Sequence, residues 1–328
     1  MKKEEQQMNE EKERKLEKTI GGLLIGAGIT ALAGAYAAYR YVFYSSPNRE
    51  EADDIRPKDP KETEEQYRFQ IDKIKALQAV PYEKVYIESF DDLRLTGRYY
   101  HISDDAPLAI MFHGYTGTPV RDFSGGYDIF SSLGFNTLII EERAHCGSEG
   151  DTISFGVNER RDVISWLDYA RERFGDDKDI ILVGISMGAA TVLMSIELGL
   201  PSNVKGIIAD CPYSAPLSII THAGMMRGLP MKIVLPLARL GAKVFGNFSI
   251  SSANAARSVK ASKVPIMIIH GEDDELVPAY MSKEIEDANP EMIERYTFPG
   301  AWHGTSYLVD PVRYAKLVAD FTKKVLTK

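Results

Sequence analysis

One short motif constrains this 328-residue chain more than any other feature: Gly184-Ile185-Ser186-Met187-Gly188. It follows the continuous apolar run Ile180–Val183 and opens the helical stretch Met187–Leu198. A sharp strand-to-helix turn of this kind holds its serine in a strained backbone conformation, with the amino end of the helix pointing at it. An unreactive turn of glycine and serine can have the same sequence pattern, but the position of the motif between a buried strand and a helix favours a nucleophilic Ser186.

From residue 81 onward, short apolar runs alternate with helical stretches such as Glu159–Phe174. Continuous apolar runs are typical of strands buried on both faces of a parallel sheet. The pattern predicts the α/β class, with a doubly wound, mostly parallel sheet that begins with a hairpin. The predicted strands are Val85–Ser89, Leu93–Tyr100, Leu108–Phe112, Thr137–Ile140, Ile180–Val183, Gly206–Ala209, Ile266–Ile269 and Tyr296–Phe298.

Two further polar side chains follow predicted strands, and the chemistry of such sheets sits beyond the carboxyl ends of the strands. Asp274 follows the seventh strand and lies four residues before Pro278, which starts the next helix; Asp273 is the alternative. His303 follows the last strand. The chain order Ser186, Asp274, His303 is that of a nucleophile, a carboxylate that orients the base, and the base itself.

The loop after the third strand, His113-Gly114-Tyr115-Thr116-Gly117, suits an oxyanion hole. Acyl transfer needs two donors aimed at the developing negative charge. We expect the backbone N–H groups of Tyr115 and Met187 to supply them. His113 is a second candidate base, but a structural role for it is favoured because the base comes last in this chain order.

These motifs carry a resemblance: the sequence is similar to the α/β-hydrolases, and within them to bacterial esterase-like and serine aminopeptidase-like members. The resemblance covers about Val85 to the carboxyl terminus. It implies an α/β-hydrolase fold with a small helical lid at about 214–262, and an acyl-enzyme mechanism. At Asp92 and Cys146 relatives usually have glycine. The motifs that carry it are residues 113–117, 142–150 (ERAHCGSEG), 184–188, 210–214 (DCPYS) and 270–278 (HGEDDELVP).

The insert between Ser214 and Val264 is rich in methionine and aliphatic residues. Flexible methionines suit an adaptable apolar pocket, so we expect esters with an apolar acyl or aryl group, although the same residues could simply pack the lid. The candidate substrate-binding residues are Met225, Met226 and Trp302. The predicted function is a serine hydrolase that cleaves carboxylic esters. The alternatives are a serine peptidase on the same three residues and a non-catalytic, membrane-tethered binding domain.

The amino-terminal segment contains no charged residue from Ile20 to Tyr39, about the length that spans a bilayer core. We expect a charged tail at 1–18, a transmembrane anchor at 19–44, a linker and leading helix at 45–80, and the hydrolase domain at 81–328. A cleaved signal peptide and a buried helix are the alternatives. More Lys and Arg precede the span than follow it, which favours a cell-membrane protein with its catalytic domain on the extracytoplasmic side.

Small residues recur along the predicted span at every fourth position. In a membrane such a ridge, containing Gly22, Gly26 and Gly34, allows close helix approach, so a homodimer is a further expectation.

The net charge of −8 argues against a nucleic-acid partner. Glu159 and Asp162 suit an acidic first helical turn better than a metal pair. No nucleotide or metal motif is present, so we expect no cofactor and no metal.

Overall fold

The computed structural model describes residues 2–46, 55, 58 and 61–327. Among these residues, eight strands form one sheet in the order β1-β2-β4-β3-β5-β6-β7-β8. β2 pairs antiparallel with both β1 and β4, and all the other neighbours are parallel. The strands are β1 (Glu83–Glu88), β2 (Arg94–Tyr100), β3 (Leu108–Phe112), β4 (Asn136–Glu141), β5 (Ile180–Ile185), β6 (Val204–Asp210), β7 (Ile266–Gly271) and β8 (Ile293–Phe298).

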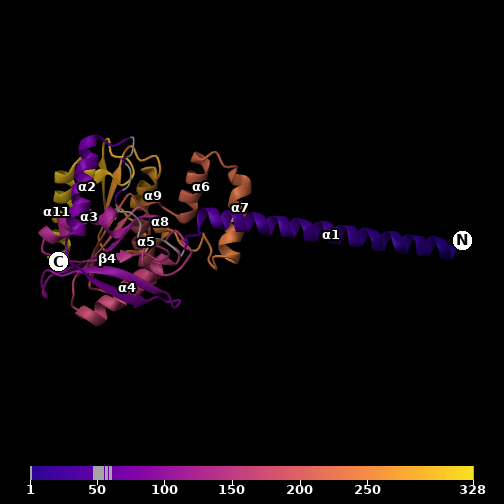
Figure 1. Cartoon of the computed structure of the whole chain (residues 1–328), viewed down its shortest axis with the longest axis horizontal. Helices are drawn as coiled ribbons and strands as arrows, with labels where there is room; N and C mark the ends of the chain where they lie inside the picture. Colours follow the sequence, from indigo (N-terminus) through magenta and orange to yellow (C-terminus); the bar gives the residue numbers. More distant parts are fainter. Residues whose placement is uncertain (1, 47–54, 56–57, 59–60, 328) are drawn as a thin grey trace.

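Helices cover both faces of this sheet (Figure 1). In β5, Ile181 and Val183 belong to the core cluster that includes residues of helices α2, α3 and α11, whereas Ile180 and Leu182 belong to the cluster that includes residues of α4, α5, α8 and α9. The sheet is therefore buried on both sides, because successive side chains of a strand point to opposite faces. The helices are α2 (Glu64–Gln78), α3 (Pro119–Ser132), α4 (Glu159–Phe174), α5 (Met187–Ser195), α8 (Ala255–Ser258), α9 (Tyr280–Ala288), α10 (Ser306–Val309) and α11 (Pro311–Leu326).

The prediction of a doubly wound, mostly parallel sheet is confirmed, and each predicted strand is present; β3 has the predicted bounds, and the others are shifted at one or both ends. The largest shift is in β8, which begins at Ile293 and not at Tyr296. Its first residues include Glu294 and Arg295, and only the two ends of this edge strand are fully buried. A continuous apolar run therefore does not mark the start of this edge strand, because charged residues lie within it.

Two residues that depart from the glycine of the resembled motifs have left-handed backbone. Asp92 has φ 64° in the hairpin turn, and Cys146 has φ 45° in the loop after β4. Glycine adopts this region without steric cost, and aspartate tolerates it better than most residues do. The strain is therefore greater at Cys146.

We expect Cys146→Gly to stabilise the protein. Left-handed strain costs roughly 1–2 kcal/mol, and the greater freedom of glycine in the unfolded chain offsets roughly 0.4–1 kcal/mol of the relief. Urea unfolding should show a free energy of unfolding that is higher by roughly 0.5–1 kcal/mol, with a smaller gain for Asp92→Gly. A lower value for Cys146→Gly would mean that packing of the thiol outweighs the strain.

The amino-terminal helix α1 (Lys2–Val42) is 41 residues long, roughly 60 Å at 1.5 Å per residue, and runs away from the sheet past the lid (Figure 1). The predicted charged tail and the predicted span thus lie in one helix. Within the described part of the chain, no helix combines the length and apolar character needed to cross a membrane. The transmembrane anchor at 19–44 is therefore not supported, although the side chains of 21–25 lie outside the described residues, as does most of the linker at 45–60.

The lid consists mainly of α6 (Pro216–Met226) and α7 (Met231–Val244). It takes up part of the small-residue ridge predicted for dimerisation, since a Cβ on Gly34 would lie 3.1 Å from Leu237 of α7. This contact of Gly34 lies within the chain. A Cβ on Gly26 would meet nothing within 4 Å, and Gly22 lies outside the residues whose side chains are described. The dimer and the membrane location stay predictions.

Candidate active site

The serine lies on a strained turn between β5 and α5. Ser186 has φ 54° and ψ −111°, outside the regions that ordinary residues favour. A Cβ on Gly184 would lie 2.4 Å from the carbonyl carbon of Gly188, and a Cβ on Gly188 would lie 1.9 Å from the carbonyl oxygen of Phe112. Both flanking glycines are therefore required by backbone contact, as the motif predicts.

The three residues predicted to act together lie in one hydrogen-bonded series. Ser186 Oγ is 2.9 Å from His303 Nε2, and His303 Nδ1 is 2.8 Å from Asp274 Oδ2. Asp274 follows β7, and His303 lies on the loop after β8. That loop is held close to β7, because Asp273 N donates to the carbonyl oxygen of Ala301 at 3.0 Å. A hydroxyl, an imidazole and a carboxylate in this order can deliver a nucleophilic alkoxide.

Asp274 is buried and held ionised. Its Oδ1 accepts hydrogen bonds from the backbone N–H groups of Leu276 and Val277, at 3.0 and 2.8 Å. Burial raises the pKa of Asp274, but hydrogen bonds from His270 and His303 outweigh it and bring the pKa down to about 2. Asp273, the alternative carboxylate, is exposed and makes no contact of this kind.

The loop after β3, which carries the candidate oxyanion donor Tyr115, is held by two buried histidines. His113 Nδ1 donates to the carbonyl oxygen of Gly114 at 2.9 Å, and its Nε2 accepts from the N–H of Glu142 at 3.1 Å. His145 Nε2 accepts from the N–H of Thr116 at 3.1 Å. Burial lowers the pKa of His113, which favours the neutral ring that these bonds require. His113 therefore has the structural role that was favoured for it.

Tyr115 and Met187 line the same cavity as Ser186. Their backbone N–H groups make no hydrogen bond within the described part of the chain. A Cβ on Gly114 would lie 3.4 Å from Ser186 Cβ, so this loop runs directly beside the serine. Two free donors beside a nucleophile can bind a developing oxyanion.

Two cavities meet at Ser186. One, of about 380 Å³, is lined mainly by apolar side chains of the lid, such as Ile219, Ile220 and Val234. The other, of about 180 Å³, has polar lining residues that include Gln70, Arg121, Asp122 and His303. Ser186 and Tyr115 border both. A substrate with an apolar part and a polar part could therefore place its reacting bond between them.

The three candidate substrate-binding residues do not line either of these cavities. Met225 and Met226 are 59% and 52% exposed, because they face outward at the end of α6. Trp302 lines a separate hollow with Lys61 and Asp274. Methionine does contribute to the apolar cavity, but through Met231 of α7. The structure therefore places Met225, Met226 and Trp302 outside the lining of the two cavities at Ser186.

Several residues around the site were missed from the sequence. Tyr41 and Val42 of α1 line the apolar cavity, and Gln70 of α2 lines the polar one. His270 lies with Nε2 3.3 Å from Asp274 Oδ2 and donates to the carbonyl oxygen of Val277 at 2.8 Å. Of these residues, only His270 could have been found from the sequence, because it lies four residues before Asp274 in the same motif. Tyr41, Val42 and Gln70 belong to helices outside the sheet.

Among the described residues, Cys211, Asp274 and His303 alone bring three possible metal-binding atoms within 4.8 Å of one another. Asp274 and His303 are already bonded to each other, and burial raises the pKa of the Cys211 thiol well above its ordinary value. A thiol that resists ionisation is a poor metal ligand. The group therefore suits acid–base chemistry better than metal binding.

Glu159 and Asp162, at the start of α4, have partners in the protein. Glu159 accepts from the N–H groups of Ser154 and Gly156, at 2.7 and 2.8 Å. Asp162 accepts from the Arg143 guanidinium at 2.6 Å. They are held by these contacts in addition to any effect of the helix dipole.

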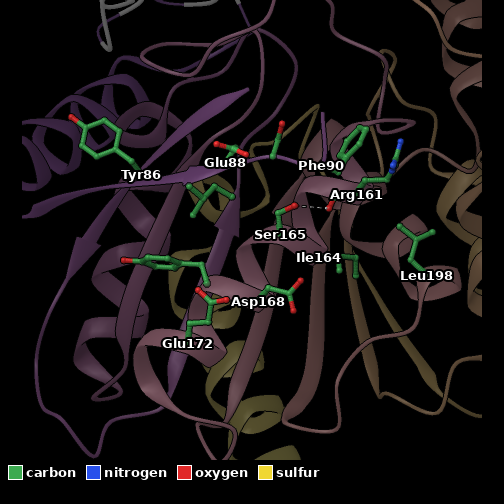
Figure 2. Close-up of a pocket in the computed structure, with 12 residues that line it drawn as sticks. Tyr86, Glu88, Phe90, Arg161, Ile164, Ser165, Asp168, Glu172 and Leu198 are labelled. Atoms are coloured by element: carbon green, nitrogen blue, oxygen red, sulfur yellow. Dashed lines mark hydrogen bonds between the residues drawn. The ribbon is translucent and has the colours of Figure 1, made fainter. Parts of the chain in front are cut away.

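A larger hollow of about 660 Å³ lies elsewhere, between the β1–β2 hairpin and α4 (Figure 2). It shares no lining residue with the two cavities at Ser186. Its labelled side chains include Glu88, Asp168 and Glu172, with Phe90 and Arg161 at one end (Figure 2).

Comparison with known proteins identifies the fold. A family model described as the alpha/beta hydrolase fold matches residues 107–233. An esterase from Pyrococcus furiosus, Pf2001, superposes with a TM-score of 0.63 at 22% identity, covering 76% of this chain and 93% of that one. Est1E from Butyrivibrio proteoclasticus, with ferulic acid bound, gives a TM-score of 0.55 at 19% identity over 74% of this chain and 100% of that one. This chain has the α/β-hydrolase fold.

Curated relatives are also similar in sequence. YqkD of Bacillus subtilis, an uncharacterized protein, is 25% identical over 225 residues, which is 68% of this chain and 73% of the relative. The lysophosphatidylserine lipase ABHD12 of Xenopus tropicalis is 25% identical over 195 residues, covering 56% of this chain and 47% of the lipase. The match therefore spans less than half of that lipase.

Proposed function

We propose that this protein is a serine hydrolase that cleaves carboxylic esters with Ser186, His303 and Asp274. The observation that carries the proposal is their hydrogen-bonded series, at 2.9 and 2.8 Å, on an α/β-hydrolase fold. Each of the three side chains follows a strand of the parallel part of the sheet, where ligands of such sheets bind. An ordinary structural serine has no reason to occupy a strained turn beside a histidine–carboxylate pair.

In the proposed mechanism, His303 Nε2 takes the proton of the Ser186 hydroxyl as its oxygen attacks the ester carbonyl carbon. Asp274 accepts a hydrogen bond from Nδ1–H and stabilises the imidazolium that forms. The N–H groups of Tyr115 and Met187 donate to the oxyanion. His303 then gives the proton to the departing alcohol, which leaves Ser186 acylated. Water, deprotonated by His303, attacks the acyl-enzyme and releases the acid.

The cavities support an ester with an apolar acyl or aryl portion. The apolar cavity beneath the lid suits that portion, and the polar cavity beside Gln70 and Arg121 suits the alcohol. The similarity to a structurally known esterase and to a lysophosphatidylserine lipase supports esters over peptides.

The experiment is hydrolysis of a substrate panel by the full chain: p-nitrophenyl esters from acetyl to palmitoyl, an aryl hydroxycinnamate ester and an aminoacyl-arylamide. We expect turnover of the esters, with an optimum that reflects the apolar cavity. Turnover of the arylamide alone would identify a serine peptidase. If the folded protein turned over no substrate and was not labelled by a fluorophosphonate, the binding domain would replace the enzyme.

A further inference from the structure

The last turns of α1 pack against the lid helix α7 at backbone contact distance. A Cβ on Gly241 would lie 2.3 Å from the carbonyl oxygen of Ala35 and 3.0 Å from Cβ of Tyr39. Only glycine at position 241 permits this approach. Ala35 and Tyr39 are buried by it, whereas residues earlier in α1, such as Ile29, are exposed. The end of α1 is therefore part of the packing of the lid.

The chain that leaves α1 is held on its other side by the segment after β4. Ile153 N donates to the carbonyl oxygen of Phe43, and Ser45 N donates to that of Asp151, both at 2.7 Å. The Phe43 side chain is fully buried and packs edge-on against Phe155, with ring centroids 6.0 Å apart. The position of the helix end is thus fixed relative to the sheet.

This helix end touches the candidate site directly. Tyr41 and Val42 line the apolar cavity that reaches Ser186. The Tyr115 hydroxyl donates to the carbonyl oxygen of Val42 at 3.4 Å, and its ring stacks on Phe155 with centroids 5.1 Å apart. Tyr115 is also the residue whose N–H is proposed to bind the oxyanion.

We propose that the carboxyl-terminal end of α1 is a wall of the acyl pocket, and that Val42 and Tyr41 determine how long or bulky an acyl or aryl group the enzyme accepts. The inference rests on the proposed ester hydrolysis for its substrate. Val42 lines this cavity but is none of the three proposed reacting residues, so a larger side chain there removes space from the cavity and leaves Ser186, His303 and Asp274 unchanged in the sequence. Each methylene that can no longer be buried weakens binding roughly four-fold.

The test uses the full chain with Val42→Phe, Tyr41→Ala and the matched control Ile29→Phe. Ile29 lies on the same helix but is exposed and outside the cavity. We expect Val42→Phe to lower the ratio of kcat/KM for p-nitrophenyl dodecanoate to that for the acetate at least ten-fold. Tyr41→Ala should raise this ratio about three-fold or more, and Ile29→Phe should leave it unchanged. Because Tyr41 is exposed, its variant keeps the test available if Val42→Phe does not fold.

Calorimetric binding of dodecanoate to the same proteins separates this inference from the proposed function. If the protein hydrolyses no ester but Val42→Phe weakens dodecanoate binding, the proposed ester hydrolysis is overturned and the proposed pocket wall is supported. If Val42→Phe, Tyr41→Ala and Ile29→Phe all hydrolyse esters with the same chain-length profile, the proposed pocket wall is overturned and the proposed ester hydrolysis is supported. Absence of both hydrolysis and dodecanoate binding in the wild type would overturn both.

Discussion

Ser186→Ala is expected to lower kcat/KM for the best p-nitrophenyl ester at least roughly 10⁴-fold. The reason is that His303 and Asp274 can activate only a nucleophile at hydrogen-bond distance, and Ser186 Oγ occupies that place at 2.9 Å. The turn itself is held by the backbone contacts of Gly184 and Gly188, so the fold should persist. The measurement is initial-rate hydrolysis, with the circular dichroism spectrum and the melting temperature recorded on the same samples.

The matched control is Ser165→Ala, because Ser165 lies on α4 and lines only the distant hollow of Figure 2. It should keep the activity of the wild type. Retention of more than a tenth of the wild-type activity by a folded Ser186→Ala protein would show that another group is the nucleophile.

Asp274→Asn is expected to lower kcat about 10⁴-fold while the protein stays folded. An asparagine amide at this position can donate to His303 Nδ1, which favours the tautomer with its proton on Nε2. That tautomer cannot accept the proton of Ser186. Steady-state kinetics measure the loss, and Asp273→Asn is the neighbouring control, expected to keep wild-type rates. Equal losses in both variants would mean that the overall charge of this loop matters and not the contact with His303.

Asp274 should also shape the dependence of stability on pH. Its pKa in the folded protein, about 2, is below the ordinary value of about 3.9. The ionised form therefore contributes roughly 2 kcal/mol to the free energy of unfolding above pH ~4, and this contribution is lost as the pH falls towards 2. Urea unfolding between pH 6 and 3 should show a stability advantage of the wild type over Asp274→Asn that shrinks with acidification. A constant difference over this range would contradict the role of ionised Asp274.

The strands and the candidate reacting residues could be predicted from the sequence because the residues that indicate each of them are close together in the chain. A strand buried on both faces must be apolar along its length, as β3, with all five residues buried, illustrates. The motif around Ser186 is contiguous in the sequence, although only Gly184 is required by a neighbour within the motif, and Gly188 is required by the backbone of Phe112 on β3. The chain order then brings Asp274 and His303 to the same sheet edge, since the carboxyl ends of parallel strands coincide.

The substrate cavity could not be predicted in the same way. Met225 and Met231 are residues of the same type in the same insert, yet Met225 is exposed to solvent and Met231 lines the cavity. The difference depends on how α6 and α7 are oriented on the domain. Gln70 likewise borders the site only because α2 packs beside α3.

The sequence by itself determined the α/β sheet, the serine turn and the order of the three candidate reacting residues, because each depends on backbone geometry and periodicity over a short stretch. Only the tertiary structure decided where the amino-terminal helix packs. An uncharged segment rich in glycine and alanine has the same sequence pattern whether it packs against lipid or against protein. The close contact of Ala35 with Gly241, from segments about 200 residues apart in the chain, is what brings the end of α1 onto the lid and its residues Tyr41 and Val42 into the cavity.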